Sequence, residues 1–388
     1  MFLLRSKHKL CSFFGVLLIM IGLPTLAAAG AKIKIDDTKY FQIGMGYRGS
    51  ISLIEDNAPT GKDASFDLQT DNLRLYTVSQ VHKNIQVEFN TELATVDDWT
   101  GGGTIETDRT GVVLLDAVAK VDFGLFEFWL GRQLPPSDRF NLDGPFYLNA
   151  AYSFPIVQDY PNIFAGRDNG AAIHGGVNGG KFKWAYGAFE GRTGATSSDQ
   201  QDRVMHAARL DFALGDPEPG FYTGSTYFGA KKLTTIGFVY MSEEDGVGTS
   251  TDPGDYTGMN VDFLIERTLG NGAVVDLEGA YFDYDTDNKA DASRTQGESF
   301  LILASYLAPK KTSIGGIQGK LQPYFRYQGF NRDMKNITNN TGYKSRTEAG
   351  INYVIDGFNA KITGLWYVDE GVGNTATNTG MLAMQFQL

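Results

Sequence analysis

Acidic and basic side chains recur at even spacing in short segments along the chain. Glu88 and Glu92 lie four residues apart, and the same spacing separates Asp116 from Lys120. Even spacing puts side chains on one face of a β-strand, and ionised groups on such a face need water or an opposite charge. We predict a water-filled interior whose wall carries Arg74, Glu88, Glu92, Asp116, Lys120, Lys181, Lys183, Arg203, Arg209, Asp262, Glu266, Asp276, Glu278 and Arg326. In the alternative interpretation, these charges only solvate the wall and pair with one another.

A second group of charges lies in a stretch from residue 132 to residue 168 that interrupts this pattern. The stretch holds five prolines and several aromatic residues, whereas a flexible external loop would be mostly Ser, Gly and Asn. Charges at a low-dielectric constriction select ions more strongly than the same charges on an open wall. We predict that the stretch folds inward and presents Arg132, Asp138, Arg139, Asp143, Arg167 and Asp168 to passing solutes. The alternative is a lid or a subunit contact that lies outside.

A hydrolase is the rival function from a different class, because Ser197, Ser198 and His206 could supply a serine–histidine pair at an outer rim. Such a pair also needs an orienting group on a neighbouring element. Nothing in the sequence ties the serines to the histidine. We therefore assign no catalytic residue and predict that the protein is not an enzyme.

Metal and cofactor chemistry has little support. His82 and His174 are isolated, and Cys11 is the only cysteine, so neither a histidine cluster nor a thiolate site is predicted. The acid-rich stretches 242–245 and 283–287 could hold divalent cations, but they lack the fixed spacing and glycine of a helix-loop calcium site. We expect solvated external loops there, no metal site and no cofactor.

The elements that position these side chains are predicted to be β-strands. From Ile85 to Leu93, apolar residues occupy every odd position except Thr91 and polar residues every even one, so one face of the strand is largely apolar. Segments of ~10 residues with this pattern, flanked by aromatics, are typical of strands that cross an outer membrane at a tilt. Their apolar faces, for example Phe126, Phe128 and Leu130, are then expected to touch lipid. The candidate strands are 40–54, 68–81, 84–95, 111–122, 125–132, 169–178, 181–190, 202–213, 233–241, 257–268, 272–283, 297–307, 317–329, 342–355, 358–368 and 378–388.

The connections between these segments alternate in length. Tight turns such as 82–83 alternate with longer polar ones such as 55–67 and 242–256, as short periplasmic turns alternate with longer external loops. By this alternation, 132–168 is the third external loop and 215–231 is an oversized periplasmic connection. Closure leaves no unpaired strand edge in lipid. We predict an all-β fold, a transmembrane antiparallel β-barrel of about 16 strands whose long third external loop folds into the pore.

Residues 1–29 are predicted to be a cleaved secretory signal. The bases Arg5, Lys7 and Lys9 precede an apolar run over residues 13–26. A membrane anchor is the alternative, but the run is shorter than the ~20 apolar residues that a spanning helix needs. Residues 30–388 then form a single outer-membrane β-barrel domain.

The C-terminal segment places Phe386 and Leu388 on its apolar face. This ending resembles the signal read by the outer-membrane assembly machinery, although that signal usually ends in Phe. We expect that machinery, outer-membrane lipid and lipopolysaccharide as partners. The formal charge is −11, and it becomes more negative without the three bases of the signal. Nucleic acid is therefore not expected as a partner.

Three stretches resemble the phosphate-selective porin O and P family: residues 130–136 (LGRQLPP), 167–175 (RDNGAAIHG) and 216–229. These motifs are short, and the similarity in pattern covers most of the mature chain. The resemblance implies a sixteen-stranded homotrimeric barrel in which the third loop folds inward and basic residues guide anions. The chain departs from the family's basic members, because 45 acids outnumber 34 bases and no arginine ladder is evident.

Together these observations predict a porin of the outer membrane of a Gram-negative bacterium, located there after cleavage of the signal. Its function would be passive diffusion of small hydrophilic solutes or ions, with phosphate and other anions among the candidates. The hydrolase and an adhesin or receptor barrel are the alternatives. The mixed signs of the wall and loop charges leave the ion preference and the identity of the solute open.

Overall fold

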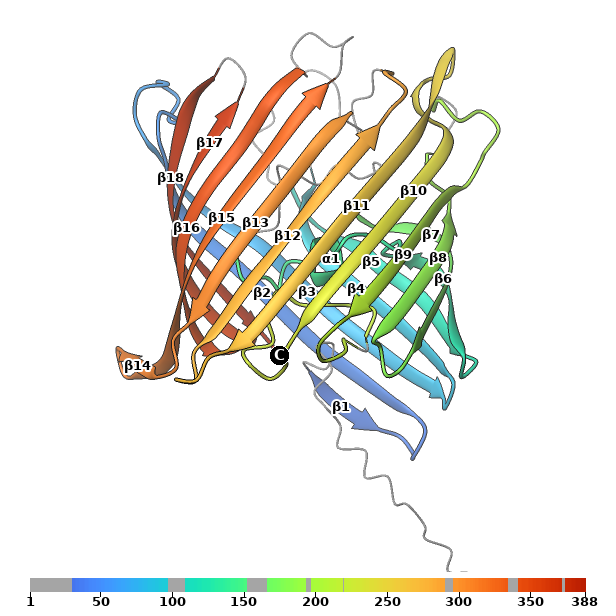
Figure 1. The fold of residues 1–388 in the computed structure, drawn as a ribbon, viewed down its shortest axis with the longest axis horizontal. Helices are drawn as coiled ribbons and strands as arrows, with labels where there is room; N and C mark the ends of the chain where they lie inside the picture. The colour runs from blue at the N-terminus through green and yellow to red at the C-terminus, as the bar shows by residue number, and fades with distance from the viewer. Residues whose placement is uncertain are drawn as a thin grey trace, which may run out of the picture.

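The structure is a computed structural model that describes residues 30–96, 109–151, 166–192, 197–218, 220–289, 296–333, 341–371 and 374–388. Sixteen strands of these residues form a closed antiparallel barrel (Figure 1). They are β2 (Tyr40–Ile54), β3 (Ser65–His82), β4 (Ile85–Val96), β5 (Arg109–Asp122), β6 (Phe126–Gln133), β7 (Asp168–Val177), β8 (Phe182–Phe189), β9 (Met205–Ala213), β10 (Thr234–Thr249), β11 (Asp252–Thr268), β12 (Val274–Asp285), β13 (Gly297–Leu307), β15 (Ile317–Asp333), β16 (Thr341–Asp356), β17 (Ala360–Gly371) and β18 (Asn374–Gln387).

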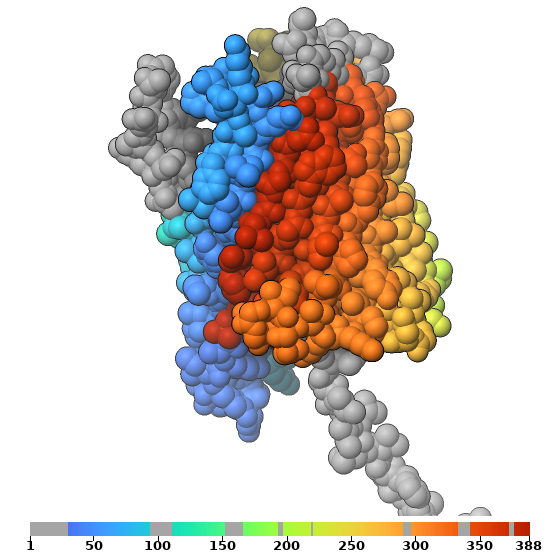
Figure 2. Space-filling model, turned by 90° about the vertical axis from the view of Figure 1, so that its left-hand side faces the viewer, coloured from blue at the N-terminus to red at the C-terminus, as the bar shows by residue number. Residues whose placement is uncertain are grey.

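The last strand closes the barrel against the first. In the β18–β2 pair, Phe386 lies opposite Tyr47 and Gln387 lies opposite Gly46. Figure 2 shows this seam, where the red C-terminal strands lie directly beside the blue N-terminal ones. Closure gives each barrel strand a partner on both sides, so that backbone N–H and C=O groups are paired within the sheet.

Two short strands lie at the foot of the barrel. The strand β1 (Ala31–Lys34) pairs with the start of β2. The strand β14 (Lys311–Ile314) forms a hairpin with β15. Gly315 and Gly316 connect this hairpin with φ angles of 59° and 87°, the positive values that a two-residue turn of this type requires.

The sequence alternation corresponds to the two faces of the wall. On β15, the outward Phe325 is 49% exposed, whereas the following residue, Arg326, is 0% exposed and faces inward. The predicted lipid-facing residues Phe126 and Leu130 are likewise exposed on the outside of β6. The predicted fold class, a closed antiparallel barrel of sixteen strands, is confirmed.

The prediction of an external loop at 242–256 is wrong for most of this stretch. The strands β10 and β11 continue as a hairpin, with Glu243 opposite Tyr256 and Thr249 opposite Asp252. The polar and glycine residues of this stretch hydrogen-bond across the hairpin, with a register shift between Glu243 and Val247. Polar composition alone therefore did not distinguish a loop from a strand that projects beyond the apolar band.

The helix α1 (Arg139–Asp143) follows β6 and lies inside the barrel (Figure 1). Among the described residues, no helix is long and apolar enough to span a membrane. The predicted signal at residues 1–29 lies outside the described residues, as does the stretch 97–108 between β4 and β5.

Candidate functional site

The connection between β6 and β7 enters the barrel interior. We call its described residues 134–151 the third-loop segment; residues 152–165 lie outside the description. Asp138 caps α1, and its Oδ1 accepts hydrogen bonds from the backbone N–H groups of Phe140, at 2.9 Å, and Asn141, at 3.2 Å. The backbone N–H of Arg139 donates to a carboxylate oxygen of Asp262 on β11, 3.0 Å away. The start of the segment is therefore bound to the inner wall.

Inward-facing side chains of the wall also hold the backbone of this segment. Lys361 Nζ on β17 donates to the carbonyl oxygen of Leu148 at 2.7 Å. Asn352 Nδ2 on β16 donates to the carbonyl of Asn149 at 2.7 Å, and Gln385 Nε2 on β18 donates to that of Phe146 at 2.8 Å. The segment thus follows the wall formed by β16–β18.

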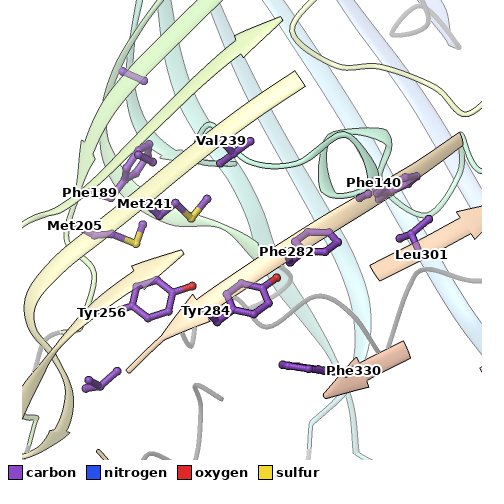
Figure 3. Close-up of a cluster of buried hydrophobic side chains, with 14 of the residues drawn as sticks. Phe140, Phe189, Met205, Val239, Met241, Tyr256, Phe282, Tyr284, Leu301 and Phe330 are labelled. Carbon is purple, nitrogen blue, oxygen red and sulfur yellow. The ribbon is translucent and has the colours of Figure 1, made fainter. Parts of the chain in front are cut away.

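An apolar patch on the inner wall receives the segment's helix. Phe140 is buried with Phe282 and Leu301 of the wall, and Figure 3 shows these side chains together. The same cluster includes Val239 and Met241 on β10. The inner face is therefore not uniformly polar, in contrast to the predicted water-filled wall, because part of it serves as a core for the loop.

A second connection enters from the opposite end. The stretch 215–231 was predicted to be an oversized periplasmic connection. It lies between β9 and β10, and we call the described residues of 214–233, which leave out residue 219, the inner turn. Phe221 packs against Trp129 and His174 on the inner wall, with ring centroids 5.2 and 4.4 Å apart. Lys183 Nζ on β8 donates to the carbonyl of Gly220 at 2.9 Å. The turn therefore lies within the barrel.

The third-loop segment and the inner turn are joined by a buried ion pair. Arg139 Nη2 and Nη1 donate to the two carboxylate oxygens of Glu218 at 2.6 and 2.9 Å. Burial by itself would raise the pKa of Glu218, but the Arg139 charge and hydrogen bonds outweigh it and lower that pKa to about 2. The backbone N–H of Ser225 also donates to the carbonyl of Tyr147 at 2.9 Å. The two connections thus form one unit across the lumen.

Asp143 ends α1 at this junction. Its carboxylate accepts hydrogen bonds from the hydroxyls of Thr223 at 2.6 Å and Ser225 at 3.3 Å. Burial raises the pKa of Asp143 to about 7, although the Arg139 charge opposes the shift. The group therefore changes charge near neutral pH.

A cavity of about 120 Å³ lies between this unit and the wall formed by β3–β5. Its wall side carries ion pairs: Arg74 with Glu92 at 2.7 Å, and Arg167 with Asp116 at 2.9 Å. Its other side is largely apolar and aromatic. The lining residues are Arg74, Tyr76, Val78, Glu88, Asn90, Asp116, Leu134, Leu142, Asp143, Gly144, Pro145, Phe146, Tyr147, Arg167, Tyr222 and Thr223.

The aromatic side of the cavity depends on a glycine of the wall. The rings of Tyr76 and Phe146 meet edge to face, with centroids 6.2 Å apart. A Cβ at Gly46 on β2 would lie only 2.6 Å from the Phe146 ring. The Phe146 ring can therefore lie against the barrel at this place only because residue 46 has no side chain.

The six candidates predicted in the third loop have different positions. Asp143 and Arg167 line the cavity, whereas Arg139 lies behind it in the pair with Glu218. Asp138 caps α1, as described above. Asp168 begins β7 and accepts a hydrogen bond from the backbone of Gly191 at 2.7 Å. Arg132 belongs to β6, where its Nε donates to the carbonyl of Leu114 at 3.4 Å.

The predicted wall residues fall into three groups. Those at or beside the cavity are Arg74, Glu88, Glu92, Asp116 and Lys120. Those buried on the inner wall elsewhere are Lys183, Arg209, Asp262, Glu266, Asp276, Glu278 and Arg326. Two lie off the wall: Lys181 is exposed in the turn before β8, and Arg203 lies in the connection before β9.

Sequence reasoning missed two kinds of site residue. The first is the aromatic lining. The inward direction of Phe146, Tyr147 and Tyr222 depends on how the connections fold, whereas Tyr76 on β3 shares the even spacing of Arg74. The second is the set of neutral polar anchors, Asn149, Gln322, Asn352 and Gln385. The even spacing that identified the charges also applies to Asn352 and Gln385, so neutral polar residues at such positions were an available signal.

The residues considered for other chemistry have separate partners. His206 Nδ1 shares a hydrogen bond with the Tyr186 hydroxyl at 2.8 Å on the outer surface. The Ser197 hydroxyl donates to the carbonyl of Asp199 at 2.8 Å. Within the described ranges, no group of three or more His, Cys, Asp or Glu side chains could hold a metal ion.

The closed sixteen-stranded antiparallel barrel is the fold of outer-membrane porins. The chain is similar to OmpF of Salmonella typhi in complex with daunomycin, with a TM-score of 0.62 and 11% identity over 92% of this chain and 100% of that one. It is also similar to the outer membrane channel DcaP of Acinetobacter baumannii, with a TM-score of 0.58 and 10% identity over 93% and 100%. For the trimer form of the outer membrane protein OmpT of Vibrio cholerae, the TM-score is 0.55 and the identity 12% over 91% and 100%. No protein-family model and no curated protein matches the sequence.

Proposed function

We propose that the protein is a porin of the Gram-negative outer membrane through which small hydrophilic solutes and ions diffuse passively. The observation that carries this proposal is the third-loop segment, held inside a closed barrel with a cavity of about 120 Å³ beside it. A barrel of this strand number is wide enough to enclose an aqueous channel. The segment and the inner turn narrow that channel at the level of the cavity.

The charges at the cavity favour weak ion selectivity over a strong preference for phosphate or other anions. Arg74, Arg167 and Lys120 each form an ion pair with an acid on β4 or β5. A pore that strongly selects anions presents bases in excess at its constriction. Balanced pairs attract neither sign strongly.

The test is ion current through the purified, refolded protein in a planar bilayer, with a salt gradient that gives the reversal potential. We expect stepwise conductance and a reversal potential close to zero. Absence of conductance steps would overturn the proposed function and favour a barrel whose lumen is blocked. A large anion preference with block by phosphate would instead support the selectivity implied by the porin O and P resemblance.

Deletion of residues 140–160 tests whether the third loop constricts the pore. We expect a higher single-channel conductance, because the deletion removes the helix and the backbone that wall residues such as Lys361 hold. Shortening the β14 hairpin at the foot of the barrel is the control. An unchanged conductance in the 140–160 deletion would contradict the constriction.

We also propose a homotrimer that reaches the membrane through the outer-membrane assembly machinery after cleavage of residues 1–29. The Vibrio cholerae structure of this fold is described as a trimer form. Phe386 on β18 is 43% exposed and Leu388, directly after this strand, is 69% exposed. The apolar C-terminal face is therefore available for recognition, for lipid and for a neighbouring subunit. Mobility of the unheated protein in detergent gels measures the oligomeric state.

A further inference from the structure

We propose that the cavity between the third-loop segment and β3–β5 is a binding site for solutes with one aromatic ring and one carboxylate. The proposal rests on the proposed channel function and names the class of solute that the narrow passage would retain. Three observations carry it: the size of the cavity, the rings on one side, and the guanidinium groups on the other.

The size of the cavity corresponds to one ring. Its volume is about 120 Å³, and an engineered protein cavity of about 150 Å³ accommodates benzene. A disaccharide or a bulkier solute would have to displace the third-loop segment. That segment is held by Lys361, Asn352 and Gln385, which makes such displacement costly.

The connections supply a surface on which a ring can stack. Phe146, Tyr147 and Tyr222 line the cavity from these connections, and Tyr76 faces them from β3. Leu134, Leu142 and Pro145 complete this side. Aromatic rings that stack or meet edge to face attract each other beyond the effect of their buried area. A small hydrated anion such as phosphate would lose water against these rings and gain nothing from them.

The wall supplies a partner for the carboxylate. Arg74 binds Glu92 through Nε and Nη2, and its Nη1 lies 3.8 Å from the place where a Cβ of residue 144 would be. Its guanidinium carbon also lies 5.9 Å from the centroid of the Phe146 ring. A ring stacked beside Phe146 would therefore place its carboxylate next to Arg74, whose Nη1 could donate to it while Nε and Nη2 stay on Glu92.

The first experiment measures interruptions of single-channel current by added solutes. Benzoate is the probe, and acetate and benzyl alcohol separately supply the acid and the ring. We expect benzoate to stay bound at least about tenfold longer than either control, since a charged hydrogen bond and ring stacking each contribute. If the residence time of benzoate equals that of acetate or that of benzyl alcohol, the inference is overturned.

Two variants separate the roles of the guanidinium fork and the ring. Arg74→Lys keeps the charge but loses the fork, and we expect the benzoate residence time to fall about tenfold. Arg346→Lys is its control, because Arg346 forms a two-bond pair with Asp369 and lies 4.0 Å from the Tyr367 ring without lining the cavity.

Tyr222→Leu tests the ring surface, with the outward-facing Tyr281→Leu as its control. We expect shorter benzoate events only in Tyr222→Leu. Unchanged events in both Arg74→Lys and Tyr222→Leu would overturn the assignment. A wild-type barrel that conducts without distinguishing benzoate refutes only this inference, whereas a barrel that does not conduct refutes the proposed function.

Discussion

Gly46 is the residue at which the wall makes room for the third-loop segment. A Cβ there would lie 2.6 Å from the Phe146 ring, and overpacking of this kind costs about 1–3 kcal/mol. We expect Gly46→Ala to push the ring toward the cavity and to lower the single-channel conductance. Gly364→Ala is the control, because a Cβ at Gly364 meets nothing within 4 Å. Equal conductance in the two variants would contradict the packing argument.

Asp143 makes the cavity sensitive to pH. Burial raises its pKa to about 7, so the folded protein holds this proton more tightly than the unfolded chain does between about pH 4 and pH 7. The stability that the proton contributes is present below this range and is lost as the pH rises through about 7. The ionised carboxylate then adds a negative charge to the cavity lining.

We therefore expect the reversal potential in a salt gradient to shift toward cation preference between pH 5.5 and pH 8.5, because ionised Asp143 adds about one negative charge to the cavity lining. Asp143→Asn removes the titrating group and should remove the shift. Recordings of wild type and variant at both values of pH measure it. A shift that persists in Asp143→Asn would assign the titration to another group.

At the scale of elements, the third-loop segment and the inner turn depend on each other through Arg139 and Glu218. Glu218→Ala would leave Arg139 buried without its carboxylate, and loss of one partner of a buried pair costs about 3–5 kcal/mol. We expect the two connections to separate locally while the barrel stays closed. Faster proteolytic cleavage within 134–151 and a noisier current are the measurements.

The exposed pair of Lys34 and Asp37 provides the control for this prediction. Pairs of that kind contribute about 0–1 kcal/mol, so Asp37→Ala should leave the cleavage rate unchanged. If Glu218→Ala is cleaved no faster than Asp37→Ala, the ion pair does not hold the two connections together.

At the scale of the whole molecule, closure through β18 decides whether the barrel exists in lipid. Deletion of residues 379–388 removes the residues that pair with β2 from Gly46 to Ile54. The freed backbone groups would lie in lipid without partners, at several kcal/mol each. We expect no folded barrel, seen as loss of the mobility difference between unheated and heated protein in detergent gels. Deletion of β1, which pairs outside the β18–β2 seam, should keep that difference.

The sequence by itself determined the wall. Alternation with a period of two is a local property, so it located the sixteen strands, the outward direction of Phe325 and the inward direction of Arg326 without any knowledge of neighbours. Residue composition gave a wrong prediction at 242–256, where polar residues pair across the hairpin of β10 and β11 instead of forming a loop. Composition also did not predict that the apolar side chains of Met241 and Phe282 face inward, because they are buried there in one cluster with Phe140 of the third-loop segment.

Only the tertiary structure decided the site. The contacts of Arg139 with Glu218, of Lys361 with Leu148 and of Phe146 with Gly46 join residues 79, 213 and 100 positions apart. No periodicity relates such positions, because the path of a connection depends on which surfaces the closed wall offers it. The charges of the interior could thus be predicted from spacing, whereas their pairing and the narrow cavity they share with aromatic rings follow from closure of the barrel around two inward connections.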